Sequence, residues 1–494
     1  MNIREKSNVG NQFEIYQDFC HIVGHENATF DGNDIHPYRE NVTEYRQDIL
    51  GVVYPRHEKD LHKIVILANQ RKLSLFPISQ GKNWGYGSRL PGSSHCIVVD
   101  FSRHMNEIIE VNEDMGYAII QPGVTQGQLA DYLQSTHSDY FIDVTGSSRC
   151  SSIIGNCLER GVAFNSKRDE LLLSLRILTG SGQFVNTAHD DNQLTLQPPS
   201  CQPNITSLFI QSSFGFVCLA FVRLIRRAPV TKVFNFIPHK NLNLDNFFKD
   251  LANLYNENHL NCIFHLYNAQ RLGTLRIPFL GQPEWFGVGN VKGSSRTVRA
   301  AKNEIKKRLR KHGRAVFYTE TLIGRLRKIS PFMKHMLGLI ESSVAIQQGK
   351  PRDTAVLDTF GTLKPDNEAK IFFGFIVFAF PHTDTSRFSD CFRELMAMFD
   401  NAKFGVSINL LDSYFVEAVM SIEGNREDNN EVKFLQHVMA QTIQTLIKEG
   451  FKPYRLDVNN LHRVPQNSSC KVVEGLKDML DPCTVIASGK YSNV

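Results

Sequence analysis

The segment FPISQGKNWGYGSRLP, residues 76–91, places three glycines within seven residues: Gly81, Gly85 and Gly87. Glycine adopts positive φ without steric cost and lets the backbone approach a ligand, while converging N–H groups bind anions. The spacing GxxxGxG is neither the dinucleotide fingerprint GxGxxG nor the P-loop GxxxxGK[ST]. The segment therefore predicts a phosphate-binding loop outside those two classes, with a surface turn as the alternative.

The composition is that of a globular protein with more than one core. The 494 residues are 42% hydrophobic and 21% charged, which predicts at least two domains. The N-terminus lacks an apolar run, and the longest apolar run, residues 371–380, has ten residues. A membrane span needs about 20 apolar residues, so we predict no signal peptide, no membrane segment and a cytoplasmic location.

Cysteine usage and charge argue against two further classes of protein. The ten cysteines form no CxxC motif and do not cluster with histidine, which predicts reduced thiols rather than disulfides or a metal site. The net charge of +5 is concentrated in residues 302–314, KNEIKKRLRKHGR. A nucleic-acid surface would interleave aromatic or base-reading residues. We interpret this segment as the solvated face of a helix and predict no nucleic-acid partner.

The first part of the chain predicts an α+β unit with the glycine loop at a strand end. Residues 1 to about 40 indicate a short helix and segments without regular secondary structure. A strand over residues 73–79 then leads into the loop, and Thr125 is placed to cap a helix over residues 125–134. An earlier helix is indicated by apolar residues at i, i+3, i+4 and i+7, namely Leu61, Ile64, Val65 and Ala68.

Two later segments continue this unit. Residues 143–164, DVTGSSRCSSIIGNCLERGVAF, are rich in serine and glycine and can lie along a flat polar ligand, with a serine-rich loop as the alternative. Residues 171–187 indicate a strand, a tight turn and a strand. Residues 209–229 indicate a short helix and a strand, and a change of composition near residues 229–232 marks a domain boundary.

The middle of the chain predicts a second α+β domain, in which helices pack on an antiparallel sheet. Residues 279–293, which contain irregularly spaced glycines, are interpreted as a loop. The expected helices span residues 242–256, 298–309, 388–399 and 430–448, and the expected strands span residues 262–268, 371–380 and 413–422.

Five ordered motifs give the chain a family resemblance. They are GKNWGYG at 81–87, PGV at 122–124, SIIGNCLERGVAF at 152–164, QSSFGFV at 211–217 and DPCTVIASGK at 481–490. On these motifs the chain resembles the vanillyl-alcohol oxidase and p-cresol methylhydroxylase family of FAD-linked oxidoreductases. The resemblance runs from about residue 46 to 229 and from about 450 to the end. It implies an FAD-binding domain over residues 1–229, completed by residues 450–494, and a substrate cap over residues 230–449.

The resemblance also implies the residues that hold FAD. Residues 78–83 would wrap the pyrophosphate, and Lys490 would lie near the N1–C2=O edge of the flavin, where a cation stabilises the reduced anion. The implied FAD-binding residues are Ile78, Ser79, Gln80, Gly81, Lys82, Asn83, Trp84, Pro122, Gly123, Gly146, Ser147, Ser152, Gly155, Asn156, Gly161, Val162, Gly215, Val217 and Lys490.

On the substrate side, the resemblance implies that Tyr86, Tyr454 and Arg455 hold a phenolic oxygen. A permanent positive charge and two hydroxyl donors would lower the pKa of a bound phenol. Hydride would then leave the benzylic carbon for the flavin, giving a quinone methide. The expected partners are a small aromatic or alcohol substrate and either O₂ or an electron-acceptor protein, and a homodimer is possible.

The sequence departs from the family at several positions. Lys370 stands nearest to the histidine or tyrosine that attaches FAD covalently in several members, so we expect non-covalent FAD. Ser147 aligns with the catalytic aspartate of vanillyl-alcohol oxidase, which leaves Glu417 as the candidate base. The segment NSKRDE, residues 165–170, replaces the family's YGxH, which indicates a larger substrate or one that is not a simple phenol.

Two other functions remain open from the sequence. One is an FAD oxidase of an aliphatic alcohol, a sugar or an amine, in which Tyr86 and Arg455 bind a different polar group. The other is a non-catalytic protein on a flavin-binding fold, which docks a partner through the basic residues 302–314.

Overall fold

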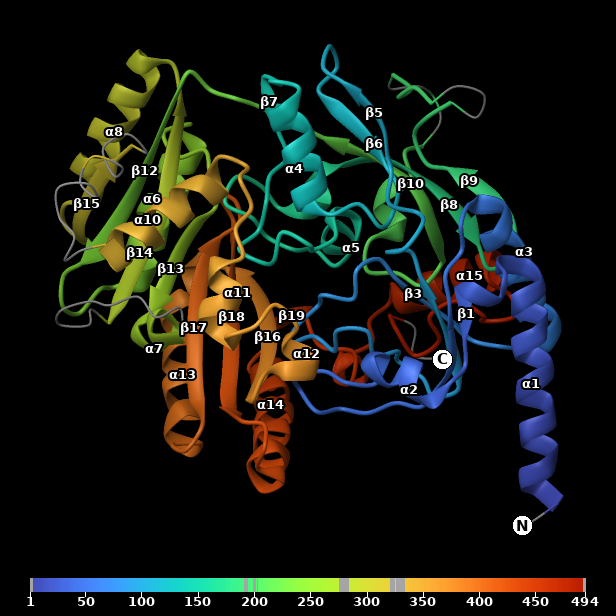
Figure 1. Ribbon diagram of the computed structural model, residues 1–494. Helices are drawn as coiled ribbons and strands as arrows, with labels where there is room; N and C mark the ends of the chain where they lie inside the picture. The colour runs from blue at the N-terminus through green and yellow to red at the C-terminus, as the bar shows by residue number, and fades with distance from the viewer. Residues whose placement is uncertain are drawn as a thin grey trace.

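The computed structural model describes residues 3–190, 194–198, 201, 203–274, 284–319, 325 and 334–491. Two α+β halves lie side by side, one built mainly from the first 229 residues and one around a large sheet (Figure 1). The α+β fold class is thus confirmed. Among the described helices, none is both long and apolar enough to cross a membrane.

The N-terminal half contains a mixed sheet and an antiparallel sheet. The first has the order β1-β2-β4-β3 and carries the glycine loop after β3, and the second has the order β5-β6-β10-β8-β9. A two-stranded sheet joins β11 to β7. The strands are β1 (Ala28–Thr29), β2 (Ile49–Val53), β3 (Leu75–Ile78), β4 (Cys96–Asp100), β5 (Ile108–Asn112), β6 (Tyr117–Ile120), β7 (Tyr140–Phe141), β8 (Leu172–Thr179), β9 (Phe184–Asn186), β10 (Gly215–Arg223) and β11 (Ile225–Arg226).

The second half is one antiparallel sheet of eight strands, in the order β15-β12-β14-β13-β17-β18-β16-β19. Its strands are β12 (Val230–Pro238), β13 (Phe264–Asn268), β14 (Trp285–Gly293), β15 (Gly313–Tyr318), β16 (Ile371–Pro381), β17 (Lys403–Leu410), β18 (Phe415–Asn425) and β19 (Lys452–Arg455). The apolar sides of α6, α8, α13 and α14 (bounds below) pack on this sheet and form the largest core of the described residues.

The helices of the first half are α1 (Ile3–Val23), α2 (Gly32–Ile35), α3 (Glu58–Arg71), α4 (Gln126–Ser135) and α5 (Ile153–Leu158). Those of the second half are α6 (Leu244–Asn256), α7 (Ala269–Thr274), α8 (Ser295–Leu309), α10 (Lys334–Gln347), α11 (Thr354–Phe360), α12 (Pro365–Glu368), α13 (Thr385–Met398) and α14 (Asn429–Lys448), and α15 (Cys470–Leu480) follows β19.

The last segment of the chain returns to the first half, where Figure 1 shows the red α15 and where its apolar side chains pack against the core of the antiparallel sheet. Ala487 donates a backbone hydrogen bond to Leu75 at 2.7 Å, and Leu75 donates one to Val485 at 2.6 Å. The buried Lys477 ammonium is 2.6 Å from the Ser213 carbonyl. These contacts hold the segment around Lys490 against the strand that carries the glycine loop.

Most predicted elements are present near their predicted bounds. The four apolar residues of α3 are fully buried, and Thr125 caps α4 with its hydroxyl and forms a reciprocal capping box with Gln128. The N-terminal helix was predicted to be short, but α1 has 21 residues. The ten cysteines are free thiols.

The prediction of a loop over residues 279–293 is wrong for its described part, because Trp285–Gly293 is strand β14. Its glycines accommodate aromatic rings. A Cβ added at Gly287 would lie 2.4 Å from the Phe264 ring, and one at Gly289 would lie 2.8 Å from the Phe234 ring. Residues 279–283 lie outside the described part of the chain.

Candidate active site

The three glycines of the loop after β3 have positive φ, and each meets a different part of the molecule. Gly81 has φ +62°, and a Cβ there would lie 2.3 Å from Arg89 Cγ. Cβ atoms on Gly85 and Gly87 would each lie 2.7 Å from a side chain, that of Phe375 on β16 and that of Val458 in the C-terminal segment. Glycine density in this loop therefore also reflects close packing of the loop against the second half and the C-terminal segment.

A cavity of about 860 Å³ runs between the two halves. Every predicted FAD-binding residue except Gly123 lines it, together with the four predicted catalytic residues. Gly123 instead packs under the loop, where its carbonyl accepts a hydrogen bond from the Gln80 amide at 2.5 Å. Sequence motifs separated by up to about 400 residues thus converge on one cavity.

The serine-rich segment forms a second wall of the cavity. Gln126 fixes its backbone by donating to the Ser147 and Ser148 carbonyls at 3.3 and 2.9 Å. Ser152 caps α5 and also donates to the Pro122 carbonyl at 3.3 Å. Ser151 is another residue of this wall, and its buried hydroxyl has no hydrogen-bond partner among the described residues.

The residues of this wall fit FAD. No atom lies within 4 Å of where a Gly146 Cβ would stand, so a flat group can approach the backbone there. Burial lowers the pKa of Lys82, whose ammonium lies 5.5 Å from the Trp84 ring centroid and lines the same cavity. A diphosphate is negatively charged and accepts hydrogen bonds, so a wall that offers a cation and hydrogen-bond donors suits it.

Lys490, predicted to lie at the flavin edge, pairs with Glu159 at 2.5 Å. Tyr491 also donates a hydrogen bond to Glu159. Burial alone would raise the pKa of Glu159, but Lys490 and Arg455 outweigh it and hold that pKa below its ordinary value. The sequence analysis missed Glu159, although it lies inside the ERG motif. The Glu159 carboxylate therefore partly neutralises the positive charge of Lys490. This weakens the electrostatic effect that we predicted for Lys490 at the flavin edge.

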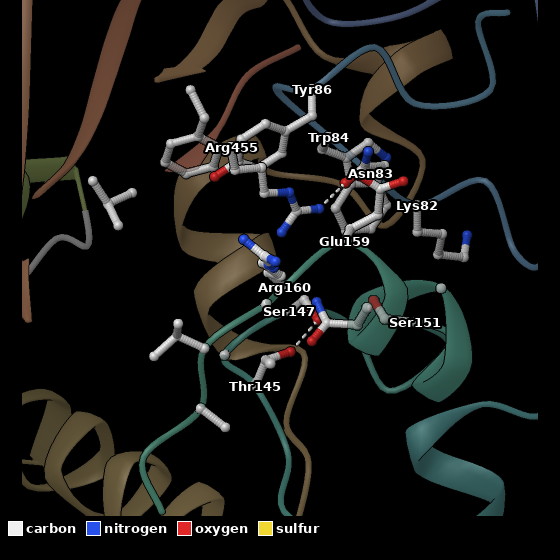
Figure 2. A pocket seen from close by; sticks show the side chains of 18 of the residues that line it. Lys82, Asn83, Trp84, Tyr86, Thr145, Ser147, Ser151, Glu159, Arg160 and Arg455 are labelled. Carbon is white, nitrogen blue, oxygen red and sulfur yellow. Dashed lines mark hydrogen bonds between the residues drawn. The ribbon is translucent and has the colours of Figure 1, made fainter. Parts of the chain in front are cut away.

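The four predicted catalytic residues form one cluster. The Arg455 guanidinium lies 4.0 Å from the centroid of the Tyr86 ring, and Phe375 stacks on Tyr86 at 5.2 Å. Arg455 donates to the Asn83 amide oxygen, but its buried Nε has no hydrogen-bond partner among the described residues. Figure 2 shows that the Arg455 and Arg160 side chains project into the same cavity.

A β-bulge explains why consecutive residues of β19 both line the cavity. Arg455 pairs with Val377 and Pro453 pairs with the next residue, Phe378, so Tyr454 is the extra residue of the bulge. Alternation along a regular strand would turn Tyr454 and Arg455 to opposite faces, and a bulge breaks that alternation. This register depends on β16 and could not be predicted from the local sequence.

Burial sets the protonation states in this cluster. It raises the pKa of Tyr86 to about 12, against a smaller opposing effect of Arg455, and it also raises the pKa of Tyr454. Both hydroxyls are therefore protonated donors near neutral pH. Burial raises the pKa of Glu417 to about 7, although the Asn409 amide donates to it at 2.8 Å and Arg455 opposes the shift.

We expect Gly81→Ala to weaken FAD binding. The substitution places a Cβ against Arg89 and a non-glycine residue at positive φ, which costs about 1–2 kcal/mol, or roughly 5- to 30-fold in affinity. Titration of the apoprotein with FAD measures the change. Gly475→Ala is the matched control, because Gly475 lies in α15 with no atom within 4 Å of the added Cβ. Unchanged FAD affinity in Gly81→Ala would contradict the assignment of this loop.

Comparison with known proteins agrees with this cavity. A family model described as an FAD binding domain matches residues 49–188, which include the glycine loop and the serine-rich segment. The protein is an FAD-dependent oxidoreductase. This match confirms the expected FAD cofactor. The resemblance to the vanillyl-alcohol oxidase and p-cresol methylhydroxylase family is confirmed by the similar structures described next and by the 4-cresol dehydrogenase flavoprotein subunit of Pseudomonas putida, which is 24% identical over 45% of this chain and 44% of its own.

Three proteins are similar to this oxidoreductase over nearly their whole length. The 1'-carboxy-chondrochloren decarboxylase of Chondromyces crocatus is 26% identical over 90% of each chain. Substrate-bound p-cresol methylhydroxylase matches with a TM-score of 0.86 and 17% identity over 97% of each chain. The 4-ethylphenol oxidase from Gulosibacter chungangensis matches with a TM-score of 0.87 and 18% identity over 98% of this chain and 97% of that one.

Lys370, nearest to the position of covalent attachment in the family, lies outside the cavity lining. Its side chain is 79% exposed and pairs with Glu427 at 3.0 Å. Non-covalent FAD therefore stays our prediction.

Proposed function

We propose that this oxidoreductase oxidises a phenol at the benzylic carbon of a substituent para to the hydroxyl. The observation that carries the proposal is the Arg455 cluster, in which a permanent cation with a buried, unpartnered Nε lies beside Tyr86, Tyr454 and Glu417. Two of the three similar proteins are named for 4-alkylphenols. A single oxygen anion is the ligand that this arrangement of donors suits.

The residues of the cluster would activate the phenol as follows. Arg455 lowers the pKa of the phenol by placing a positive charge beside its oxygen. Tyr86 and Tyr454, which burial keeps protonated, donate hydrogen bonds to that oxygen. Glu417, with a pKa of about 7, accepts the phenolic proton.

The negative oxygen then drives loss of hydride from the benzylic carbon, because the organic product is a neutral quinone methide. FAD, when bound, supplies the acceptor for that hydride. Addition of water or loss of a proton completes the product. We propose that either O₂ or an electron-acceptor protein takes the electrons from the flavin afterwards.

A second candidate function has one specific observation behind it. The Chondromyces crocatus relative, similar over 90% of this chain, is named as a decarboxylase of a carboxylated compound. Oxidation of a carboxylated substrate with loss of CO₂ would use the same flavin. Measurement of CO₂ released per flavin reduced separates this reaction from simple dehydrogenation.

The proposed function is tested by mixing the holoenzyme anaerobically with 4-alkylphenols, benzylic alcohols, sugars and aliphatic amines. We expect the flavin absorbance to bleach with the phenols and not with sugars or amines. Admission of O₂ then shows whether oxygen restores the colour. Bleaching by a sugar or an amine, with none by any phenol, would overturn the proposal.

A further inference from the structure

A third arginine of the cavity, Arg271, has no role in the chemistry above. It lies in α7, on the second half of the molecule, and it is one of the residues that line the cavity. Its Nε and Nη1 atoms are buried and have no hydrogen-bond partner in the part of the chain that the structure describes. A buried donor without an acceptor costs free energy, and the cost is larger for a charged group. Such a cost suggests that a ligand supplies the missing acceptor.

The position of Arg271 is fixed by its surroundings. The Asn268 amide oxygen accepts the Arg271 backbone N–H at 2.8 Å and the Val406 N–H at 3.0 Å, which ties α7 to β17. Gly405 on β17 leaves the space, because a Cβ there would lie 3.2 Å from both Cα and Cδ of Arg271. The side chain is therefore held at one place in the cavity wall.

Burial lowers the pKa of Arg271, and the charge of Glu423 partly offsets that effect. None of the ion pairs within 4.0 Å among the described residues involves Arg271. The guanidinium instead lies 5.2 and 5.9 Å from the ring centroids of Phe375 and Phe373. Aromatic faces stabilise a cation but leave its N–H groups without acceptors.

Arg271 lies within reach of a ligand bound at Arg455. Phe375 is near both arginines, because its ring stacks on Tyr86, which contacts Arg455, and also lies 5.2 Å from the Arg271 guanidinium. The successive distances of 4.0, 5.2 and 5.2 Å place the two guanidinium groups no more than about 14 Å apart. Tyr267 and Ser407 line the same region. One substrate can therefore contact both arginines.

We propose that Arg271 forms a second subsite, which binds a carboxylate at the far end of the substrate's para substituent. A guanidinium can match a carboxylate with two parallel N–H bonds, either from Nη1 and Nη2 or from Nε and Nη2. Each of these two pairs includes an Arg271 atom that has no partner among the described residues. The substrate class is thus a hydroxyphenyl compound whose side chain ends in an acid. This inference rests on the proposed function for the phenolic end of the molecule.

The test compares three ligands in the holoenzyme by stopped-flow, which reads the perturbation of the flavin spectrum on binding before the flavin is reduced: 4-propylphenol, 3-(4-hydroxyphenyl)propionate and 3-phenylpropionate. We expect the hydroxyphenyl acid to bind about 10- to 100-fold more tightly than 4-propylphenol, because it adds a charge-assisted pair. Arg271→Gln should remove this preference and leave the affinity for 4-propylphenol unchanged. Lys370→Gln, which removes an exposed charge outside the cavity, should change neither.

Two results would overturn the subsite: equal binding of the acid and of 4-propylphenol by the wild type, or a preference that survives in Arg271→Gln. The third ligand separates this inference from the proposed function, because 3-phenylpropionate has no phenolic oxygen. If no phenol bleaches the flavin but 3-phenylpropionate still binds through Arg271, the subsite stands and the phenol proposal falls. If Arg271→Gln yields no holoenzyme, Arg271→Lys keeps the charge without the two-pronged geometry and should retain only part of the preference.

Discussion

Arg455→Ala should lower kcat/KM for a 4-alkylphenol by about 10²- to 10³-fold, the usual loss when one group that stabilises an oxyanion is removed. Arg455 is the cation nearest to Tyr86 in the described cluster, and its unpartnered Nε is buried where the phenol would bind. Without this charge, the bound phenol keeps a pKa near the ordinary value of about 10. Stopped-flow reduction of the flavin measures the effect.

The pH dependence gives Arg455→Ala a signature that a loss of stability would not produce. In the wild type, the charge of Arg455 lowers the pKa of the phenol, so flavin reduction should reach its plateau near neutral pH. In the variant, the rising part of the profile should move towards pH 10, because only free ionisation then supplies the phenolate. Arg455→Lys should shift the profile less, since a point charge remains.

Two controls separate the charge of Arg455 from its contact with the glycine loop. Arg455 donates to the Asn83 amide, so Asn83→Ala breaks this bond and keeps the cation. Tyr86→Phe keeps both but removes a hydroxyl, and should slow phenol oxidation while FAD stays bound. If Asn83→Ala reproduced the whole loss seen in Arg455→Ala, positioning of the loop rather than charge would explain it. Unchanged turnover of phenol in Arg455→Ala would end the phenolate mechanism.

Local patterns predicted the elements whose stability is local. The helical face that contains Leu61 and Ala68 and the cap at Thr125 involve residues within one or two turns of each other, so periodicity and capping were sufficient. The same reasoning was wrong for strand β14, because the glycines Gly287 and Gly289 indicated a loop. Their role is to accommodate Phe234 and Phe264, which lie in other strands.

The same distinction applies to the site. Ordered motifs predicted which segments line the cavity, because each motif carries a local backbone requirement. The bulge that turns Tyr454 and Arg455 to one side depends on β16, and the position of Arg271 depends on Asn268 and on the space left by Gly405. No short motif contains those contacts, so Arg271 could be found only from the folded chain.

Glu417→Gln should lower kcat/KM for a phenol by about 10²-fold or more, the range for loss of a general base. The Glu417 side chain is buried on β18, and Asn409 holds it beside the Arg455 cluster. Because burial raises its pKa to about 7, wild-type activity should rise with pH through about 7 as the carboxylate forms. The variant should lose this rise. A wild-type-like profile in the variant would exclude Glu417 as the base.

Stability supplies an independent check on Glu417. A carboxyl whose pKa rises from 4.5 to about 7 on folding binds more protons in the folded state between those values. Its contribution to the free energy of unfolding therefore falls as pH rises from about 4.5 to 7 and stays low above that. Glutamine carries no such penalty, so Glu417→Gln should be more stable than the wild type above pH 7, by up to roughly 3 kcal/mol, and similar near pH 4.

Glu427→Gln, at a carboxylate whose side chain is 61% exposed, is the matched control and should show no pH-dependent gain. A variant that gains no stability at pH 8 would show that Glu417 is already ionised at little cost, and its assignment as a base titrating near pH 7 would fail with it.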